Sequence, residues 1–247
     1  MTDSTHTLRP DGLQVAPDLE IAGPPWPIRG DGWIVFFKFD RSRRHGDYAA
    51  THGMRPYWRG GIGGLVWMKY RDTPVGPYDE LMLVPGRIEV PKARGRGRGK
   101  YWSISRIWVS SWESVVSGRA NWGIPKDRAD FSIVAHDNGE DHLTASLDGQ
   151  TICSMVCKAG LARIPINTGL FPVTLVQQWE GQAYYSKLTL KAGIEVLDVS
   201  QLWGDGVHVP DFQALGMTPL GAVKLDKFVI TFPVPVIKEG VALEETP

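Results

Sequence analysis

Short runs of aromatic and β-branched residues recur along the chain, separated by clusters of glycine, proline, aspartate and asparagine. Runs of this length and composition are typical of β-strands, and the clusters between them are typical of turns. The Asp-Gly pair at 148–149 has the signature of a two-residue hairpin. The strand-like runs lie at 33–39, 64–70, 79–84, 104–109, 131–135, 142–147, 151–157, 173–179 and 227–232. The pattern predicts a mostly-β fold of the α+β class, built on a large antiparallel sheet or barrel.

The length of the chain and the lack of an internal repeat favour a single domain. The chain has 247 residues, a length that suits one large domain or two small ones. No clear linker interrupts the strand-like runs. Residues 1–22 are polar and proline-punctuated, so we expect a loose N-terminal lead-in followed by one domain over residues 23–247.

The charge of the chain is balanced, with 27 basic and 27 acidic residues. A net charge of zero gives no overall steering toward nucleic acid or an anionic membrane. A basic tract lies at 91–102, but Arg94 and Tyr101 stand where a phosphate-binding loop needs glycine and a hydroxyl residue. We interpret the tract as a solvated hairpin loop, and we expect neither nucleic acid nor a membrane as a partner.

The two cysteines, Cys153 and Cys157, fall in one strand-like run. Four residues of extended strand separate them by about 13 Å, too far for a disulfide. The histidines show no metal-ligand spacing, so no metal site is expected. The N-terminus lacks an apolar signal core, and no apolar run reaches the roughly 18 residues that would span a bilayer. Buried, reduced cysteines and a cytoplasmic location are therefore predicted.

One short helix is predicted near 111–117. Ser110 precedes Glu113 by three residues, the spacing of a capping box, and Gly118 is a plausible C-cap. This helix leads directly into "NWGIPKDRADF" at 121–131.

Lys126 occupies a restricted and apolar frame in this segment. Pro125 fixes its own φ and restricts Ile124, while Trp122 and Phe131 offer apolar surface. Apolar packing desolvates an amine and lowers its pKa, which is what a lysine needs to attack a carbonyl as the free base. The frame suits a lysine that forms a Schiff base, although an exposed turn lysine would fit the same letters.

Several segments together resemble the acetoacetate decarboxylase family. "GRANWGIPKDRADF" (118–131) is similar to the lysine motif of that family, and "VGPYDELMLVPG" (75–86) is similar to its segment with an acidic residue after Gly-Pro-Tyr. Weaker similarity lies at 23–39, 106–118 and 227–235. The resemblance implies one domain built on a highly curved antiparallel β-barrel or cone with few short helices. It also implies a cofactor-free, homo-oligomeric lyase.

The resemblance also implies roles for particular residues. Lys126 would form an imine with a small keto acid, and Glu80 would transfer protons or orient the substrate. Substrate binding is assigned to Arg29, Tyr78 and Trp122. In the family a second lysine follows the catalytic one and lowers its pKa, an effect for which acetoacetate decarboxylase is the standard example.

Asp127 occupies the position of that second lysine in this chain. In an extended segment residues 126 and 128 share a face, so Arg128 could supply the missing positive charge. No second carboxylate of the family pattern is recognised, which makes imine formation a firmer expectation than decarboxylation. Aldol and dehydration reactions use the same imine.

Two functions remain open from the sequence. The first is a Schiff-base lyase, with decarboxylation as the leading reaction. The second is a noncatalytic β-barrel that binds a small apolar or carbonyl-containing ligand. A buried Lys126 amine near Glu80 favours the lyase, whereas an amine exposed or paired with Asp127 favours the binding protein.

Overall fold

The computed structural model describes residues 7–41, 44–49, 53–167 and 173–238. Fourteen strands, one α-helix and two short 3₁₀ helices are found in this part of the chain. All nine predicted strand-like runs coincide with strands. The elements are β1 (Trp26–Phe39), η1 (Arg44–Tyr48), η2 (Arg55–Tyr57), β2 (Trp58–Asp72), β3 (Tyr78–Val84), β4 (Arg87–Pro91), β5 (Arg98–Trp102), β6 (Arg106–Val109), α1 (Trp112–Trp122), β7 (Lys126–Arg128), β8 (Asp130–Ala135), β9 (Glu140–Leu147), β10 (Gln150–Asn167), β11 (Val173–Trp179), β12 (Gln182–Gly204), β13 (Gly221–Phe232) and β14 (Val236–Lys238).

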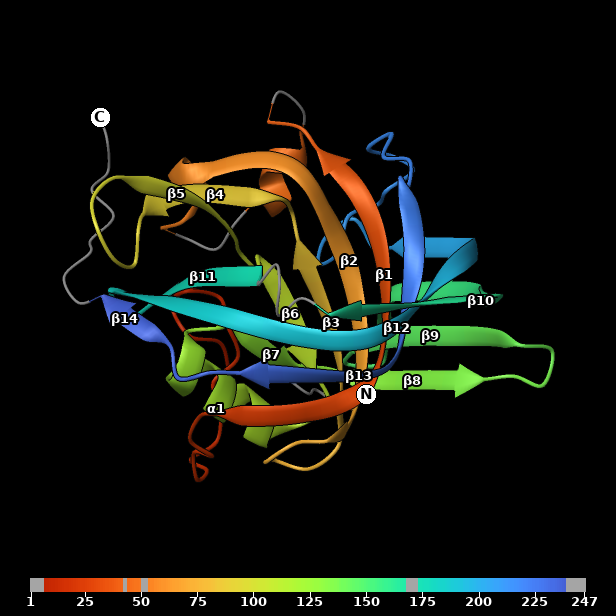
Figure 1. Cartoon of the computed structure of the whole chain (residues 1–247), viewed down its shortest axis with the longest axis horizontal. Helices are drawn as coiled ribbons and strands as arrows, with labels where there is room; N and C mark the ends of the chain where they lie inside the picture. Colours follow the sequence, from red (N-terminus) through yellow and green to blue (C-terminus); the bar gives the residue numbers. More distant parts are fainter. Residues whose placement is uncertain (1–6, 42–43, 50–52, 168–172, 239–247) are drawn as a thin grey trace.

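The strands form a single, strongly curved and mostly antiparallel sheet, as Figure 1 shows for β1, β2 and β13. β1 pairs with both β2 and β13, and β13 pairs with β12. β12 continues through β11, β5 and β4 back to β2. Two arms extend from this circuit, β3–β6–β7 and β10–β9–β8. The predicted curved, mostly-β fold is confirmed, but the arms mean that the sheet is not a regular barrel.

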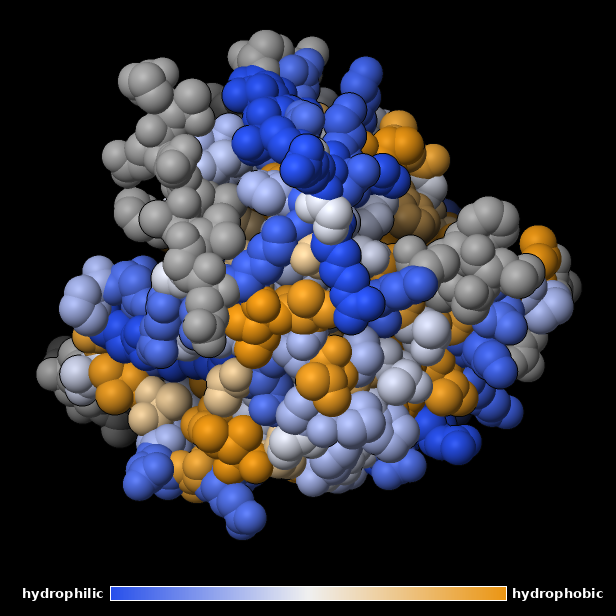
Figure 2. Space-filling model, turned by 60° about the vertical axis from the view of Figure 1, so that its left-hand side comes forward, coloured by the Kyte–Doolittle hydropathy of each residue, from blue (hydrophilic) through white to orange (hydrophobic). Residues whose placement is uncertain are grey.

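Two hairpins predicted from the sequence are present. β9 and β10 are joined at Asp148 and Gly149, which both have positive φ, as a two-residue hairpin turn requires. The basic tract forms the β4–β5 hairpin and its tip. On the face drawn in Figure 2, small groups of apolar side chains alternate with polar ones.

Helix α1 begins and ends later than the sequence predicts. Its N-cap is Ser111, not Ser110, and the Ser111 hydroxyl accepts a hydrogen bond from the Ser114 amide. The helix continues through Gly118 to Trp122 and ends at Gly123, whose left-handed φ of 62° suits glycine. Gly118 therefore serves packing rather than capping. In the described residues, no helix is long and apolar enough to cross a membrane.

Apolar side chains gather in two buried clusters. The larger cluster lies between β1, β2, β3 and the β9–β10 arm and includes Cys153 and Cys157, which are buried and unbridged as predicted. The second cluster lies beside α1 and β7 and includes Trp122 and Ile124. It surrounds the lysine singled out by the sequence.

Candidate active site

Lys126 is the first residue of β7, and its side chain points into the second apolar cluster. The residue is only 4% exposed. The parallel pairing of β7 with β6 places Lys126 beside Ile107. The side chain crosses α1 at Gly118, where an added Cβ would lie 2.7 Å from the lysine Cδ. The glycine in the helix thus makes room for the lysine, and the predicted burial of Lys126 is confirmed.

The Lys126 amine has three acceptors around it. Its Nζ lies 2.9 Å from a Glu80 carboxylate oxygen, 3.0 Å from the Ser114 hydroxyl and 3.5 Å from the Tyr78 hydroxyl. An ammonium group has three protons to donate, so these contacts satisfy it fully. Glu80 is also buried, and the two residues are 46 positions apart. The predicted meeting of Glu80 and Lys126 in one cavity is confirmed.

The two tyrosines complete a small polar cluster. Tyr70 donates a 2.7 Å hydrogen bond to the other Glu80 oxygen, and its ring lies 4.6 Å from that of Tyr78. Burial and the neighbouring Glu80 raise the pKa of Tyr70 well above its usual value. Burial also raises the pKa of Tyr78, although Lys126 opposes the rise. Both tyrosines are therefore neutral hydroxyl donors at ordinary pH.

The electrostatic balance at Lys126 differs from the sequence-based expectation. Burial lowers the pKa of the amine, as the apolar frame predicts. The Glu80 charge and the Tyr78 hydroxyl raise that pKa, and together they outweigh burial. The expected lowering is thus wrong because the frame also contains a carboxylate in direct contact. The resting site holds an ammonium–carboxylate pair.

A cavity of about 170 Å³ extends from this polar cluster. Its polar lining consists of Tyr70, Tyr78, Glu80 and Lys126, and every other described lining residue is apolar. Trp122 lies in the wall as predicted, with its indole N–H bound to the Pro233 carbonyl. The apolar residues are Trp26, Ile28, Ile34, Val66, Met68, Met82, Val84, Ile104, Ile107, Trp122, Ile124, Leu175, Leu188, Ile230 and Phe232. Tyr70 and Ser114 were not recognised from the sequence, since each is defined by its cross-strand or helix neighbours.

Asp127 points to the opposite side of β7. Its carboxylate pairs with Arg119 at 2.8 Å and accepts the Gln14 amide at 2.9 Å. Arg119 also donates to the carbonyl of Lys126 at 2.9 Å and to that of Gln14. Asp127 is thus part of a buried network that holds the lysine strand, and it makes no pair with Lys126.

Two of the expected cationic contributions are absent from the cavity. Arg128 pairs with Asp130 at 2.9 Å instead of facing Lys126, so the idea that it replaces the family's second lysine is wrong. Arg29 is also displaced: strand alternation puts Ile28 in the cavity wall and leaves Arg29 on the outer face. Its side chain is 68% exposed and lies 3.9 Å from Asp72. The structure therefore does not bring Arg29 to the site.

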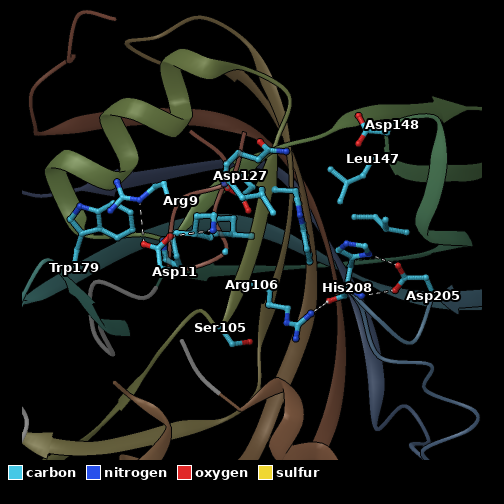
Figure 3. A pocket seen from close by; sticks show the side chains of 18 of the residues that line it. Arg9, Asp11, Ser105, Arg106, Asp127, Leu147, Asp148, Trp179, Asp205 and His208 are labelled. Carbon is cyan, nitrogen blue, oxygen red and sulfur yellow. Dashed lines mark hydrogen bonds and ion pairs between the residues drawn. The ribbon is translucent and has the colours of Figure 1, made fainter. Parts of the chain in front are cut away.

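A second and larger cleft, of about 1190 Å³, lies on the Asp127 side of β7 (Figure 3). Arg9, Asp11 and Trp179 stand at one side of the cleft, and Asp205 and His208 at another. Asp205 accepts three backbone amides and contacts the His208 ring at 2.6 Å, which fixes its own loop. Among the described residues, no group of three or more His, Cys, Asp or Glu side chains could hold a metal ion.

The fold is a curved β-sheet, and its site is a lysine–glutamate pair buried in an apolar cavity. Both features are those expected of a protein of the acetoacetate decarboxylase type. The family model for acetoacetate decarboxylase matches residues 52–168, which include both Glu80 and Lys126. The fold is similar to that of acetoacetate decarboxylase from Legionella pneumophila, with a TM-score of 0.67 and 13% identity. That match covers 90% of this chain and 91% of the other. The family match over this segment and the shared fold support an acetoacetate decarboxylase-like protein.

Two further proteins are similar to this chain, one in fold and one over part of its sequence. The enduracididine biosynthesis enzyme MppR, solved in complex with pyruvate, has a TM-score of 0.55 and 16% identity over 90% of this chain and 92% of its own. Protein NEOXANTHIN-DEFICIENT 1 of Oryza sativa subsp. japonica is 26% identical over 115 residues. That stretch is 47% of this chain and only 36% of the rice protein. Sequence similarity to these relatives is therefore low or partial.

Proposed function

We propose that this protein is a Schiff-base lyase in which Lys126 condenses with the carbonyl group of a small keto acid, with decarboxylation as the leading reaction. The observation that carries the proposal is the buried Lys126 amine, 2.9 Å from Glu80 at the polar end of an apolar cavity. The complex of MppR with pyruvate supports a keto acid as the substrate class. The chemistry uses the lysine itself and requires no cofactor.

Glu80 supplies the proton transfers that an ion-paired lysine needs. It accepts one proton from the ammonium, which frees the amine to attack the carbonyl carbon. It returns that proton to the substrate oxygen as the carbinolamine forms, and then moves a second proton from the nitrogen to the same oxygen, which leaves as water. The nitrogen keeps its last proton as an iminium, and Glu80 is again a carboxylate. This exchange within the pair replaces the neighbouring lysine of the family pattern as the means of obtaining free amine.

Loss of carbon dioxide follows from the charges around the iminium. The bond to the carboxylate breaks, CO₂ departs, and the electron pair enters the iminium to give a neutral enamine. One proton from solvent adds to the enamine carbon, and addition of one water then releases the ketone and restores the Lys126 ammonium. In the described lining Lys126 is the single cation, so the substrate carboxylate meets no second positive charge beyond the iminium. Desolvation of that carboxylate favours a reaction that removes its charge.

The experiment is turnover of a keto acid panel by the wild type, Lys126→Ala and Lys126→Arg. Both variants should lose all turnover, because alanine has no amine and arginine is not deprotonated at any working pH. Circular dichroism should show both folded, since neither deletes a large apolar volume. Turnover retained by either variant would rule out covalent catalysis. Sedimentation of the wild type tests the proposed homo-oligomer in the same preparation.

A second function is favoured by the charged resting state. The raised Lys126 pKa suits a site that holds a small apolar or carbonyl-containing ligand by a hydrogen bond from the ammonium, without reaction. In that case the panel is bound but not consumed, and Lys126→Arg retains binding.

A further inference from the structure

The walls of the Lys126 cavity bear on the part of the substrate that does not react. The cavity has two distinct ends. Alternate residues of β3 face it, beginning with Tyr78 and Glu80 and continuing through Met82 to Val84. Four residues of strand separate Glu80 from Val84, a distance of about 13 Å. All polar groups lie at the first end, and the remaining length is apolar.

The neighbouring strands repeat this division. Met68 of β2 stands opposite Glu80, and Val66 stands opposite Met82. Ile34 of β1 pairs with Val66 and extends the apolar surface beyond it. Each step along the sheet away from Glu80 thus adds aliphatic surface and no hydrogen-bonding side chain. A polar group at the far end of a substrate would find no hydrogen-bonding side chain along this surface.

The volume of the cavity sets the size of the apolar group. An engineered cavity of about 150 Å³ lined by leucine, isoleucine and phenylalanine holds benzene. This cavity, of about 170 Å³, has comparable walls. A methyl group, the substituent of acetoacetate, would leave most of it unfilled, and unfilled apolar space forfeits dispersion contacts.

The entrance of the Lys126 cavity also suits a substrate with an apolar substituent. Four lining residues are partly exposed, and all four are apolar: Ile34, Val84, Leu188 and Phe232. A ligand that reaches Lys126 past these side chains crosses an apolar rim. The only charged groups that it meets in the described lining are the paired Lys126 and Glu80.

We propose that the physiological substrate is a hydrophobic 3-oxo acid whose non-reacting substituent is an alkyl, branched or aromatic group larger than methyl. This inference rests on the proposed imine chemistry at Lys126 and adds to it the side of the substrate that lies against Met82, Val66 and Val84. Acetoacetate itself is then a poor substrate because it leaves the apolar end empty.

The test uses a series of 3-oxo acids trapped on the protein with borohydride and quantified by intact mass. Acetoacetate, 3-oxohexanoate, 3-oxooctanoate and benzoylacetate are the probes. The half-saturating concentration should fall by roughly fourfold per added methylene, and so on the order of a hundredfold from acetoacetate to 3-oxooctanoate. Equal trapping of all four, or a preference for acetoacetate, overturns the substrate class while leaving imine formation intact. No adduct with any probe means instead that the proposed function fails.

A matched pair of variants locates the substituent. Val84→Phe fills the far end of the cavity, and Val84→Ala enlarges it; the residue is partly exposed, so both should fold. Val84→Phe should lower the ratio of 3-oxooctanoate trapping to acetoacetate trapping at least tenfold relative to the wild type. Val84→Ala should retain or extend the preference for longer chains. If both variants treat 3-oxooctanoate as the wild type does, the substituent does not lie along β3.

Discussion

Replacing Glu80 with glutamine isolates the electrostatic contribution of the buried pair. Glu80→Gln keeps the shape and a hydrogen-bond acceptor but removes the charge 2.9 Å from the Lys126 amine. Burial, the largest influence on that amine, then acts without its main opponent. The pKa of Lys126 should therefore fall from above its ordinary value in the wild type to below it in the variant.

The destabilisation caused by Glu80→Gln is limited by the ability of the unpaired Lys126 to lose its proton. Breaking a buried ion pair by removing one partner costs about 3–5 kcal/mol. The lysine can escape by releasing its proton, which costs about 1.4 kcal/mol for each pH unit below 10.4. This sets an upper limit of about 5 kcal/mol at pH 7 and about 2 kcal/mol at pH 9. The loss of stability caused by Glu80→Gln should shrink accordingly as the pH rises.

The sign of the pH dependence is fixed by proton binding. In the variant the folded state binds fewer protons at Lys126 than the unfolded state does, so stability rises with pH up to about 10.4. In the wild type the raised pKa of Lys126 contributes stability that is present below the unfolded value and is lost only as pH rises through the higher folded value. The wild type should therefore show no slope from this group between pH 7 and pH 9.

The assay is urea unfolding of both proteins at pH 7, 8 and 9. Lys126→Met is the control, because it leaves the Glu80 carboxylate alone. An unpaired carboxylate escapes by taking up a proton, so the loss in this variant should shrink as pH falls from 7 to 5. A Glu80→Gln destabilisation that is the same at pH 7 and pH 9 would refute the reasoning, since the lysine would then not be charged and dependent on Glu80.

Two further variants, with Arg29→Met as a comparison, test the frame around the lysine. Gly118→Ala places a methyl group 2.7 Å from the Lys126 Cδ and 2.9 Å from its Cε. Imine trapping should therefore fall at least tenfold. The free energy of unfolding in urea should change by less than about 1 kcal/mol, because the higher helix propensity of alanine offsets the strain. Arg119→Met removes the donor to the Lys126 carbonyl and leaves Asp127 without its ion pair. It should lower the free energy of unfolding in urea by about 3–5 kcal/mol. Arg29→Met removes only an exposed contact and should change that free energy by less than about 0.5 kcal/mol. Equal losses for Arg119→Met and Arg29→Met would mean that the network does not support the lysine strand.

The strands and the central pair could be predicted because their signals are local. Each strand-like run carries its own composition, and the motifs around Lys126 and Glu80 are contiguous in the sequence. The longest strand, β12, was not predicted: exposed polar residues are interspersed along much of its length, so no apolar run marks it. β7 spans only three residues and is defined by its pairing with β6, which no local pattern reveals.

The errors at the site share a different cause, which is long-range contact. Asp127 appeared to be a poor substitute for a second lysine, but its partners Arg119 and Gln14 are 8 and 113 positions away. Arg29 was one residue away from a cavity position, and strand alternation turns a one-residue offset into the opposite face. The lowered pKa of Lys126 was predicted from its apolar neighbours and a possible contact with Arg128, whereas its direction is decided by Glu80 on another strand.

The most direct test of the account is the location of a reduced imine. The wild type is incubated with a 3-oxo acid, treated with borohydride and digested, and the adduct is mapped by mass spectrometry. Because Lys126 is the single lysine in the described lining of the cavity, the account predicts one adduct, on the peptide that contains Lys126, and none in Lys126→Arg. An adduct confined to other lysines, or one that persists in Lys126→Arg, would contradict it.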